Sequence, residues 1–137
     1  GVGWAGDAES TAQAIREASG GGVDYAIEAT GRPEAMLAAF LSTRPRGAAV
    51  LIGIPREDAV LPLPALSIPR MERRVLGSIY GSSRPERDFA TTLAMYRSGR
   101  LPLDRLVSHV LPLDEVGRAF ELMRTGEALR VVLDLAT

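Results

Sequence analysis

Two spacings of hydrophobic residues alternate along the chain and predict helices and strands in turn. Apolar residues three and four positions apart predict helices, and short continuous apolar runs predict strands that are covered on both faces. The predicted strands are residues 23–29, 48–54, 74–80, 106–111 and 130–135. Helices are predicted over residues 8–18 and after Pro33, Ser83 and Asp114, with the last three ending at Pro45, Gly99 and Gly126. This alternation predicts an α/β fold with a parallel sheet.

Residues with capping chemistry stand at the predicted helix starts. Asp7 or Ser10 can cap the first helix, and Asp114 can cap the last. The stretch Ser83-Arg84-Pro85-Glu86 has the spacing of a capping box before the third helix. These positions predict where the helices begin.

The strand over residues 23–29 runs into Thr30-Gly31-Arg32-Pro33 and then a helix, and the next strand covers residues 48–54. A right-handed crossover makes the two strands of such a unit parallel. In open parallel sheets, ligands bind beyond the carboxyl ends of the strands. The residues that follow the first strand are therefore a candidate nucleotide site.

The region after the second strand is rich in proline. Pro62, Pro64 and Pro69 cannot donate hydrogen bonds to a sheet, so residues 56–71 are predicted to form a long connection or an edge segment. Farther along, the alternating pattern gives way near Gly81-Ser82-Ser83 to a differently spaced tail. We expect a domain boundary there.

The composition limits the classes of function that the chain can have. The chain has 137 residues, 46% of them apolar and 24% charged, with a formal net charge of −1. This balance predicts a globular core and gives no positive surface for nucleic acid or an anionic membrane. Apolar runs are broken well before the roughly 18 residues that a membrane span needs. These features predict a cytoplasmic protein, and the absence of an initiator methionine at Gly1 indicates a piece of a longer one.

The chain contains no cysteine and a single histidine, His109. It therefore cannot form a disulfide or build a Cys/His zinc site by itself. We expect His109 to pack or to form a hydrogen bond within its short strand rather than to bind a metal.

Gly1-Val2-Gly3-Trp4-Ala5-Gly6 matches the glycine fingerprint of dinucleotide-binding proteins, and Glu28 follows at about the distance of the acid that binds ribose. The fingerprint works between a strand and a helix, whereas this sequence shows no strand before Gly1 and the first helix is expected to start after the motif. A glycine-rich loop is the favoured interpretation. Gly20-Gly21-Gly22 follows a helix and precedes a strand, so it is predicted to stop the helix rather than to hold a phosphate.

Four segments, residues 22–31, 50–55, 76–81 and 107–127, resemble the medium-chain, zinc-dependent alcohol dehydrogenases, in order and nearly from end to end. The resemblance implies a partial Rossmann fold, a doubly wound parallel sheet, with an α+β tail. Residues 1–81 would be the later part of the NAD(P)-binding domain, and residues 82–137 the segment that returns to the catalytic domain. The zinc ligands of that family would lie outside this chain.

The resemblance also implies cofactor contacts and no catalytic residue in this chain. Thr30 and Arg32 match positions beside the adenosine half of the dinucleotide, where a guanidinium plane can stack on adenine. The other matching positions are Ile52, Gly53 and Ile54 beside the nicotinamide, Ser78 and Tyr80 near its carboxamide, and Arg130 near the pyrophosphate. For Arg32 and Arg130, an exposed arginine without such a contact remains the alternative.

In the intact enzyme, the resemblance implies hydride transfer between an alcohol or aldehyde and NAD(P), with zinc polarising the substrate oxygen. It implies a homodimer or homotetramer that pairs through residues 59–68, for which a surface loop is the alternative. The fragment alone is expected to be inactive, and to aggregate or bind NAD poorly, because the strand over residues 23–29 would have an open edge. Two alternatives stay open: a zinc-independent quinone or enone reductase, and a non-catalytic module for nucleotide binding or dimerisation.

Overall fold

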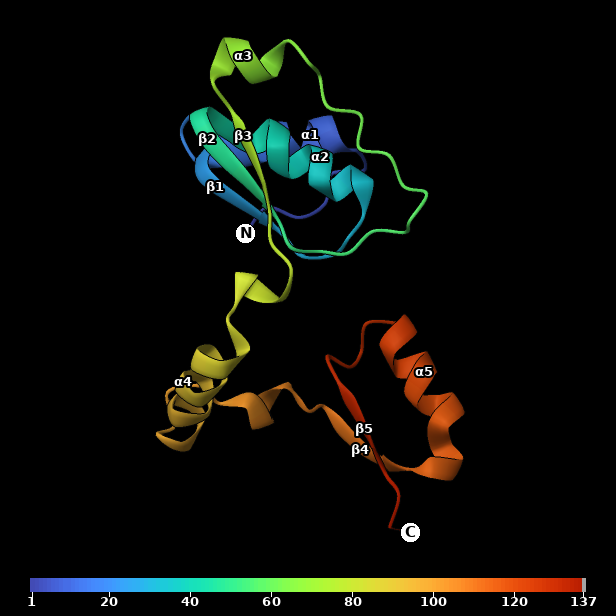
Figure 1. Ribbon diagram of the computed structural model, residues 1–137. Coiled ribbons are helices and arrows are strands. Elements are labelled where there is room, and N and C mark those ends of the chain that lie inside the picture. The colour runs from blue at the N-terminus through green and yellow to red at the C-terminus, as the bar shows by residue number, and fades with distance from the viewer. Residues whose placement is uncertain (137) are drawn as a thin grey trace. The chain divides into compact units, whose positions relative to one another are not determined.

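The computed structural model describes residues 1–136 and divides the chain into two compact units, Gly1–Ser83 and the residues from Arg84 onward (Figure 1). The first unit contains the predicted strand-helix-strand pattern, and the second contains the tail. No helix in residues 1–136 is long and apolar enough to cross a membrane.

The first unit is built around a sheet of three parallel strands in the order β1-β2-β3. Its elements are α1 (Ala8–Ala18), β1 (Val23–Glu28), α2 (Pro33–Ser42), β2 (Thr43–Leu51), α3 (Ser67–Met71), β3 (Arg74–Gly77) and a 3₁₀ turn (Tyr80–Ser82). The parallel α/β arrangement predicted from the sequence is confirmed.

Helix α1 has the bounds that the sequence predicts. Of the two candidate caps, Asp7 is the one used, because its carboxylate accepts a hydrogen bond of 2.7 Å from the backbone N–H of Ser10. This contact satisfies one of the free donors at the helix start. Gly20 follows the helix with a φ of 72°, so the glycine run stops it as expected.

Strand β2 begins five residues earlier than predicted, at Thr43, and contains Pro45. Val23 pairs with Thr43, but Tyr25 pairs with Ala48, so β2 carries extra residues at this point. Proline is tolerated in a strand at such an irregularity because no ladder hydrogen bond is required there. The prediction that the helix ends at Pro45 is wrong, since α2 stops at Ser42.

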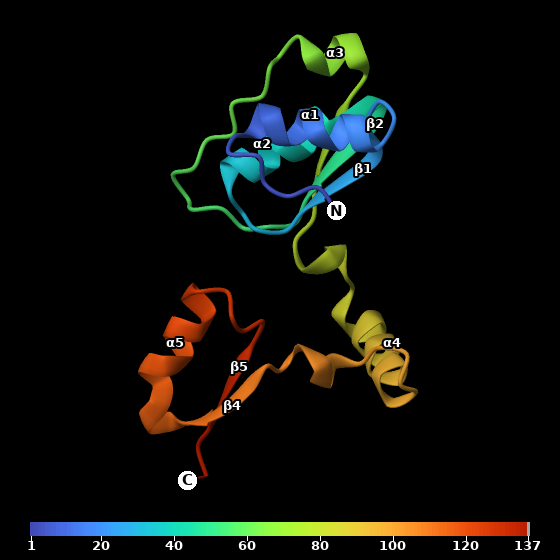
Figure 2. The ribbon, with the colours of Figure 1, turned by 180° about the vertical axis from the view of Figure 1, so that it is seen from behind.

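The core of the first unit lies between the helices and β2. Helices α1 and α2 lie side by side in the two opposite views (Figures 1 and 2). Ala12, Phe40, Ala48 and Ala49 are at most 1% exposed. Three of these four residues are alanines on α1 and β2, and small side chains of this kind allow neighbouring elements to pack closely.

The sheet is covered less fully than the apolar runs predict. Tyr25 and Ile27, two residues apart on β1, are 62% and 69% exposed, and every residue of β3 is exposed. Among residues 1–136, part of the sheet therefore lacks the second layer that a doubly wound fold provides.

The proline-rich region forms a long connection, which is one of the two alternatives that the sequence predicts. Residues 52–66 contain no helix or strand, and α3 follows at Ser67. The edge-segment alternative for residues 56–71 does not form as a strand here. Strand β3 is shorter than predicted, because the chain leaves the sheet after Gly77.

The second unit pairs two short parallel strands beside a helix (Figure 2). Its elements are α4 (Pro85–Arg97), a 3₁₀ turn (Leu103–Leu106), β4 (His109–Pro112), a 3₁₀ turn (Leu113–Glu115), α5 (Val116–Arg124) and β5 (Val131–Asp134). Leu111, Ala119 and Ala128 are its buried apolar residues within the described chain.

Two predicted caps in the second unit are wrong. The capping box at residues 83–86 does not form; instead the carboxylate of Asp88 accepts a 2.7 Å hydrogen bond from the N–H of Arg84. Asp114 lies inside a 3₁₀ turn, and α5 begins after Glu115 without a side-chain cap. At the start of α4 the Asp88 carboxylate accepts from a backbone N–H, and at the start of α5 a 3₁₀ turn precedes the helix.

Candidate functional site

The carboxyl ends of the three parallel strands meet at one edge of the sheet, which we call the carboxyl edge: residues 29–33, 52–54 and 78. Backbone hydrogen bonds hold these ends together. The carbonyl of Glu28 accepts from the N–H groups of Ile52 at 2.9 Å and Gly53 at 3.1 Å. The carbonyl of Leu51 accepts from the N–H of Ser78 at 3.0 Å. The edge is therefore a continuous, backbone-lined surface.

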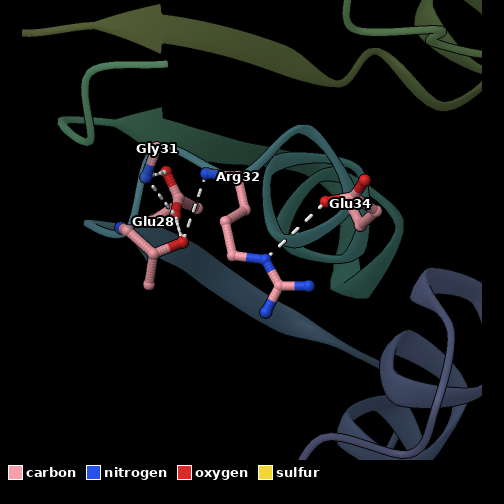
Figure 3. Close-up of polar contacts among 5 residues, drawn as sticks. Glu28, Gly31, Arg32 and Glu34 are labelled. Atoms are coloured by element: carbon pink, nitrogen blue, oxygen red, sulfur yellow. Dashed lines mark hydrogen bonds and ion pairs between the residues drawn. The ribbon is translucent and has the colours of Figure 1, made fainter. Parts of the chain in front are cut away.

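The side chain of Glu28 organises the turn between β1 and α2 (Figure 3). It is 4% exposed, and Oε1 accepts hydrogen bonds from the N–H of Thr30 at 2.6 Å, the hydroxyl of Thr30 at 2.5 Å and the N–H of Gly31 at 3.1 Å. A buried carboxylate with several donors is strongly stabilising when paired in this way. The carboxylate oxygens of Glu28 therefore accept their hydrogen bonds from within the turn.

The glycine fingerprint considered for residues 1–6 is not formed. Helix α1 starts at Ala8, after the last glycine of the motif, and the carboxylate of Glu28 faces its own turn rather than a ligand. The glycine-rich segment is a loop, as the sequence favoured.

Gly31 and Gly53 bring the ends of β1 and β2 into backbone contact. A Cβ on Gly53 would lie 2.1 Å from the nitrogen of Gly31, and a Cβ on Gly31 would lie 2.3 Å from the carbonyl oxygen of Ile54. Gly31 also has a φ of 76°. Only glycine fits at both positions. The contact leaves bare backbone at the centre of the carboxyl edge.

Thr30 and Arg32 lie in the turn between β1 and α2. The hydroxyl of Thr30 donates to Glu28 and accepts from the N–H of Arg32 at 3.3 Å. The guanidinium of Arg32 extends along the start of α2, with Nε 3.8 Å from the carboxylate of Glu34 (Figure 3). Its Cζ also lies 5.6 Å from the ring centroid of Trp4.

Trp4 is a residue of this region that the sequence reasoning did not single out. Its position depends on the path of the loop before α1, where the N–H of Ala5 donates a 2.9 Å hydrogen bond to the hydroxyl of Thr11. A loop path of this kind leaves no periodic signal in a sequence. The presence of one tryptophan in a glycine-rich loop was the only available sign.

The remaining predicted residues divide between the units. Ile52 and Ile54 are 42% and 74% exposed beside Gly53. The hydroxyl of Ser78 lies 3.0 Å from that of Ser82, and Tyr80 is 88% exposed in the 3₁₀ turn.

Arg130 belongs to the second unit. It directly precedes β5, and its carbonyl accepts a 2.9 Å hydrogen bond from the N–H of Ser108. The carboxyl edge of the first unit is thus formed without it.

The described residues do not fit a zinc site. No group of three or more His, Cys, Asp or Glu side chains in residues 1–136 is arranged to hold a metal ion. His109 lies on β4, half-buried and paired in register with Val131. We therefore derive no chemistry here from a metal bound to these residues.

Comparisons with known proteins agree with this geometry. A family model described as zinc-binding dehydrogenase matches residues 1–98. Alcohol dehydrogenase 2 of Solanum lycopersicum is 35% identical over 125 residues, which cover 90% of this chain and 33% of the relative. Alcohol dehydrogenase 1 of Pisum sativum is 34% identical over 124 residues, covering 90% of this chain and 32% of the relative.

Solved structures show the same relationship. A zinc-binding-domain alcohol dehydrogenase protein from Burkholderia ambifaria matches with a TM-score of 0.78 and 30% identity over 92% of this chain and 34% of that chain. Benzyl alcohol dehydrogenase from Acinetobacter calcoaceticus matches with a TM-score of 0.80 and 26% identity over 91% of this chain and 34% of that chain.

The strands are parallel and joined by helices, and glycines bring the carboxyl ends of two of them into backbone contact. These features define part of a Rossmann-type α/β fold. The chain belongs to the zinc-binding dehydrogenase family, which confirms the resemblance seen in the sequence. It spans about a third of the length of the curated relatives that it matches.

Proposed function

We propose that this chain is the coenzyme-side and carboxyl-terminal part of an NAD(P)-dependent, zinc-type alcohol dehydrogenase. In the whole enzyme a hydride passes between an alcohol or aldehyde and the nicotinamide. The part described here binds and orients the dinucleotide. Alone, it has no side chain that we assign to proton transfer, and we expect it to be inactive.

The observation that carries the proposal is the backbone contact between Gly31 and Gly53 at the carboxyl edge. Each glycine fills a place where a Cβ would collide with the neighbouring strand end. Side chains are thereby kept away from the line where the two strand ends meet, and a flat ligand can approach the main chain closely. The donor set fits a dinucleotide, because it offers backbone groups, one guanidinium and apolar side chains.

Within this proposal, each site residue has a physical role. Thr30 and Arg32 contact the adenosine half, and Arg32 supplies a planar cation. Ile52, Gly53 and Ile54 form the shelf for the nicotinamide.

Ser78 and Tyr80 lie beyond the end of β3, where main-chain groups can meet the carboxamide. Arg130 is proposed to reach the pyrophosphate, for which a charge-assisted hydrogen bond is the physical reason. That contact requires the second unit in its place in the whole enzyme.

The domain roles follow the same proposal. Residues 1–81 belong to the coenzyme-binding domain, and residues 82–137 return to the catalytic domain. Zinc would be held by residues outside this chain, where it would supply Lewis acidity to the substrate oxygen. The whole enzyme is proposed to be a homodimer or homotetramer.

The test uses a polypeptide that carries these residues together with the rest of the dehydrogenase. We expect alcohol-dependent reduction of NAD(P), followed by the absorbance of the reduced cofactor, and loss of that activity after treatment with a chelator. Recovery on adding zinc is the matched control. Activity towards quinones or enones that survives the chelator, with none towards alcohols, would contradict the proposal and favour the zinc-independent reductase. Cofactor binding without either activity would favour the non-catalytic module.

A further inference from the structure

Trp4 is held in place by the loop that precedes α1. The next residue, Ala5, donates its N–H to the hydroxyl of Thr11 at 2.9 Å, and Thr11 is 7% exposed on the buried side of α1. Asp7 then caps the helix. The loop is therefore tied to α1 on the carboxyl side of Trp4, which fixes where the indole can lie.

The indole of Trp4 lies against one side of the Arg32 guanidinium. The Cζ of Arg32 lies over the Trp4 ring, 5.6 Å from its centroid, within the range of a cation–π interaction. Glu34 approaches the same guanidinium at 3.8 Å, yet the Arg32 side chain stays 65% exposed. The guanidinium is thus oriented by two neighbours and still has surface left for a ligand.

A hollow of about 450 Å³ adjoins this pair. Its apolar walls include Leu37, Val60 and Pro62. Such walls suit a flat aromatic group, because apolar and aromatic side chains gain most from contact with it. The hollow belongs entirely to the first unit.

Charge around the hollow favours a neutral base over a phosphate. Besides Arg32, the lining includes the carboxylates of Asp7, Glu9 and Glu34. Three carboxylates repel a phosphate group, whereas they can accept hydrogen bonds from an exocyclic amine such as that of adenine.

We propose that Trp4 is a positioning residue for adenine: it holds the Arg32 guanidinium flat so that the base stacks on the opposite side, giving the order indole, guanidinium, adenine. The inference rests on the proposed function and adds to it a residue outside the expected cofactor contacts. Trp4 also lines the hollow, but its role in the proposal is to orient Arg32, which makes the stacking contact with the base.

The test exploits Trp4 as the only tryptophan of the 137 residues. The chain is titrated with AMP, with inorganic phosphate and with NAD+, at protein concentrations where light scattering shows no association. We expect AMP and NAD+ to change the Trp4 emission and phosphate to leave it unchanged. Calorimetry then gives the AMP affinity of the variants.

Trp4→Leu is expected to weaken AMP binding about two- to fivefold, the loss of one exposed cation–π contact. Trp4→Phe, which keeps an aromatic face, should retain most of the affinity. Phe89→Leu removes another exposed aromatic side chain, in the second unit, and should change nothing. Circular dichroism checks that each variant is folded.

A double-mutant cycle separates positioning from direct contact. In an Arg32→Lys background, which keeps the charge and loses the plane, Trp4→Leu should have no further effect on the AMP affinity. A full additional loss would show that Trp4 acts independently of Arg32 and would overturn the inference. Unchanged AMP affinity in both single variants, while NAD+ still binds, would overturn the inference alone. No binding of AMP to the wild-type chain would overturn the inference, and no binding of NAD+ to the longer polypeptide would overturn the proposed function with it.

Discussion

Gly53 carries the closest backbone contact of the carboxyl edge, and its replacement is the sharpest test at the scale of single residues. In Gly53→Ala, the new Cβ would lie 2.1 Å from the nitrogen of Gly31, so one strand end must move. We expect a loss of about 1–3 kcal/mol or more in the free energy of unfolding, as for overpacked cores. Urea denaturation measures it.

Gly77→Ala is the matched control. Gly77 ends β3, and a Cβ there would meet nothing within 4 Å. It should cost nothing and can stabilise the chain by about 0.4–1 kcal/mol through the unfolded state. Equal destabilisation by the two substitutions would contradict the role given to the Gly31–Gly53 contact.

Glu28 is expected to matter for stability rather than for ligand chemistry. Glu28→Gln keeps the shape of the side chain but removes the charge that three donor groups share. We expect a loss of about 1.5–3 kcal/mol in unfolding free energy, the range for hydrogen bonds to charged groups. Glu34→Gln, in an exposed ion pair, should change stability by less than about 0.5 kcal/mol. Equal effects of the two would show that the Glu28 turn is not stabilising.

The site residues differ in how far the sequence could predict them. Thr30, Gly31 and Arg32 follow a strand end, so topology alone assigns them to the carboxyl edge. The role of Glu28 was not predicted, because a carboxylate near a strand end also fits a ribose-binding acid. The contact of Trp4 depends on a loop path that no periodic pattern encodes.

At the scale of elements, the cap of α1 makes a prediction about pH. Hydrogen bonds from the backbone N–H and then the hydroxyl of Ser10 lower the pKa of Asp7 below its usual 3.8. A carboxyl whose pKa is lower in the folded state stabilises the fold above its unfolded pKa, and this contribution is lost as the pH falls through the folded pKa. The α1 amides should therefore lose hydrogen-exchange protection below about pH 4.

Asp7→Asn isolates this effect. Asparagine keeps an oxygen that can cap the helix but does not titrate in this range. The acid-dependent loss of protection in α1 should be smaller in the variant. Identical profiles for the wild type and Asp7→Asn would contradict the assigned cap.

The bounds of an element were predicted correctly where several local signals agreed. They were predicted wrongly where contacts with other parts of the chain set the bounds. Helix α1 has a cap, an apolar face and a glycine stop, and its bounds were predicted correctly. Strand β2 starts early because Thr43 pairs with Val23 across the sheet, and this contact overrides the breaking tendency of Pro45. The capping box before α4 failed because the N–H of Ser83 donates to the carbonyl of Tyr80 in the preceding turn, and Arg84, whose N–H donates to Asp88, is the residue at the helix start.

At the scale of the whole chain, the edge of β1 has the clearest consequence. Strand β1 pairs with β2 on one side, and within residues 1–136 no strand pairs with its other side. An open edge with exposed apolar side chains favours association with another chain. We expect the 137-residue chain to self-associate, as its sequence suggested.

Ile27→Lys tests the edge directly. A lysine on an edge strand opposes pairing with a second strand, so sedimentation velocity should show a shift towards monomer. Leu129→Lys is the control, because Leu129 is exposed to a similar degree, 77% against 69% for Ile27, but lies in the second unit and outside the strands. An equal shift in both variants would mean that added charge, rather than the β1 edge, controls association.

The central claim is that the carboxyl edge binds the dinucleotide in the whole enzyme. A titration with NAD+ of the longer polypeptide that carries these residues, followed by the chemical shifts of its backbone amides, tests this claim most directly. The account predicts that shifts concentrate at Gly31, Arg32, Gly53 and Ser78. Shifts confined to the amino ends of the strands, or no shifts at saturating NAD+, would contradict it.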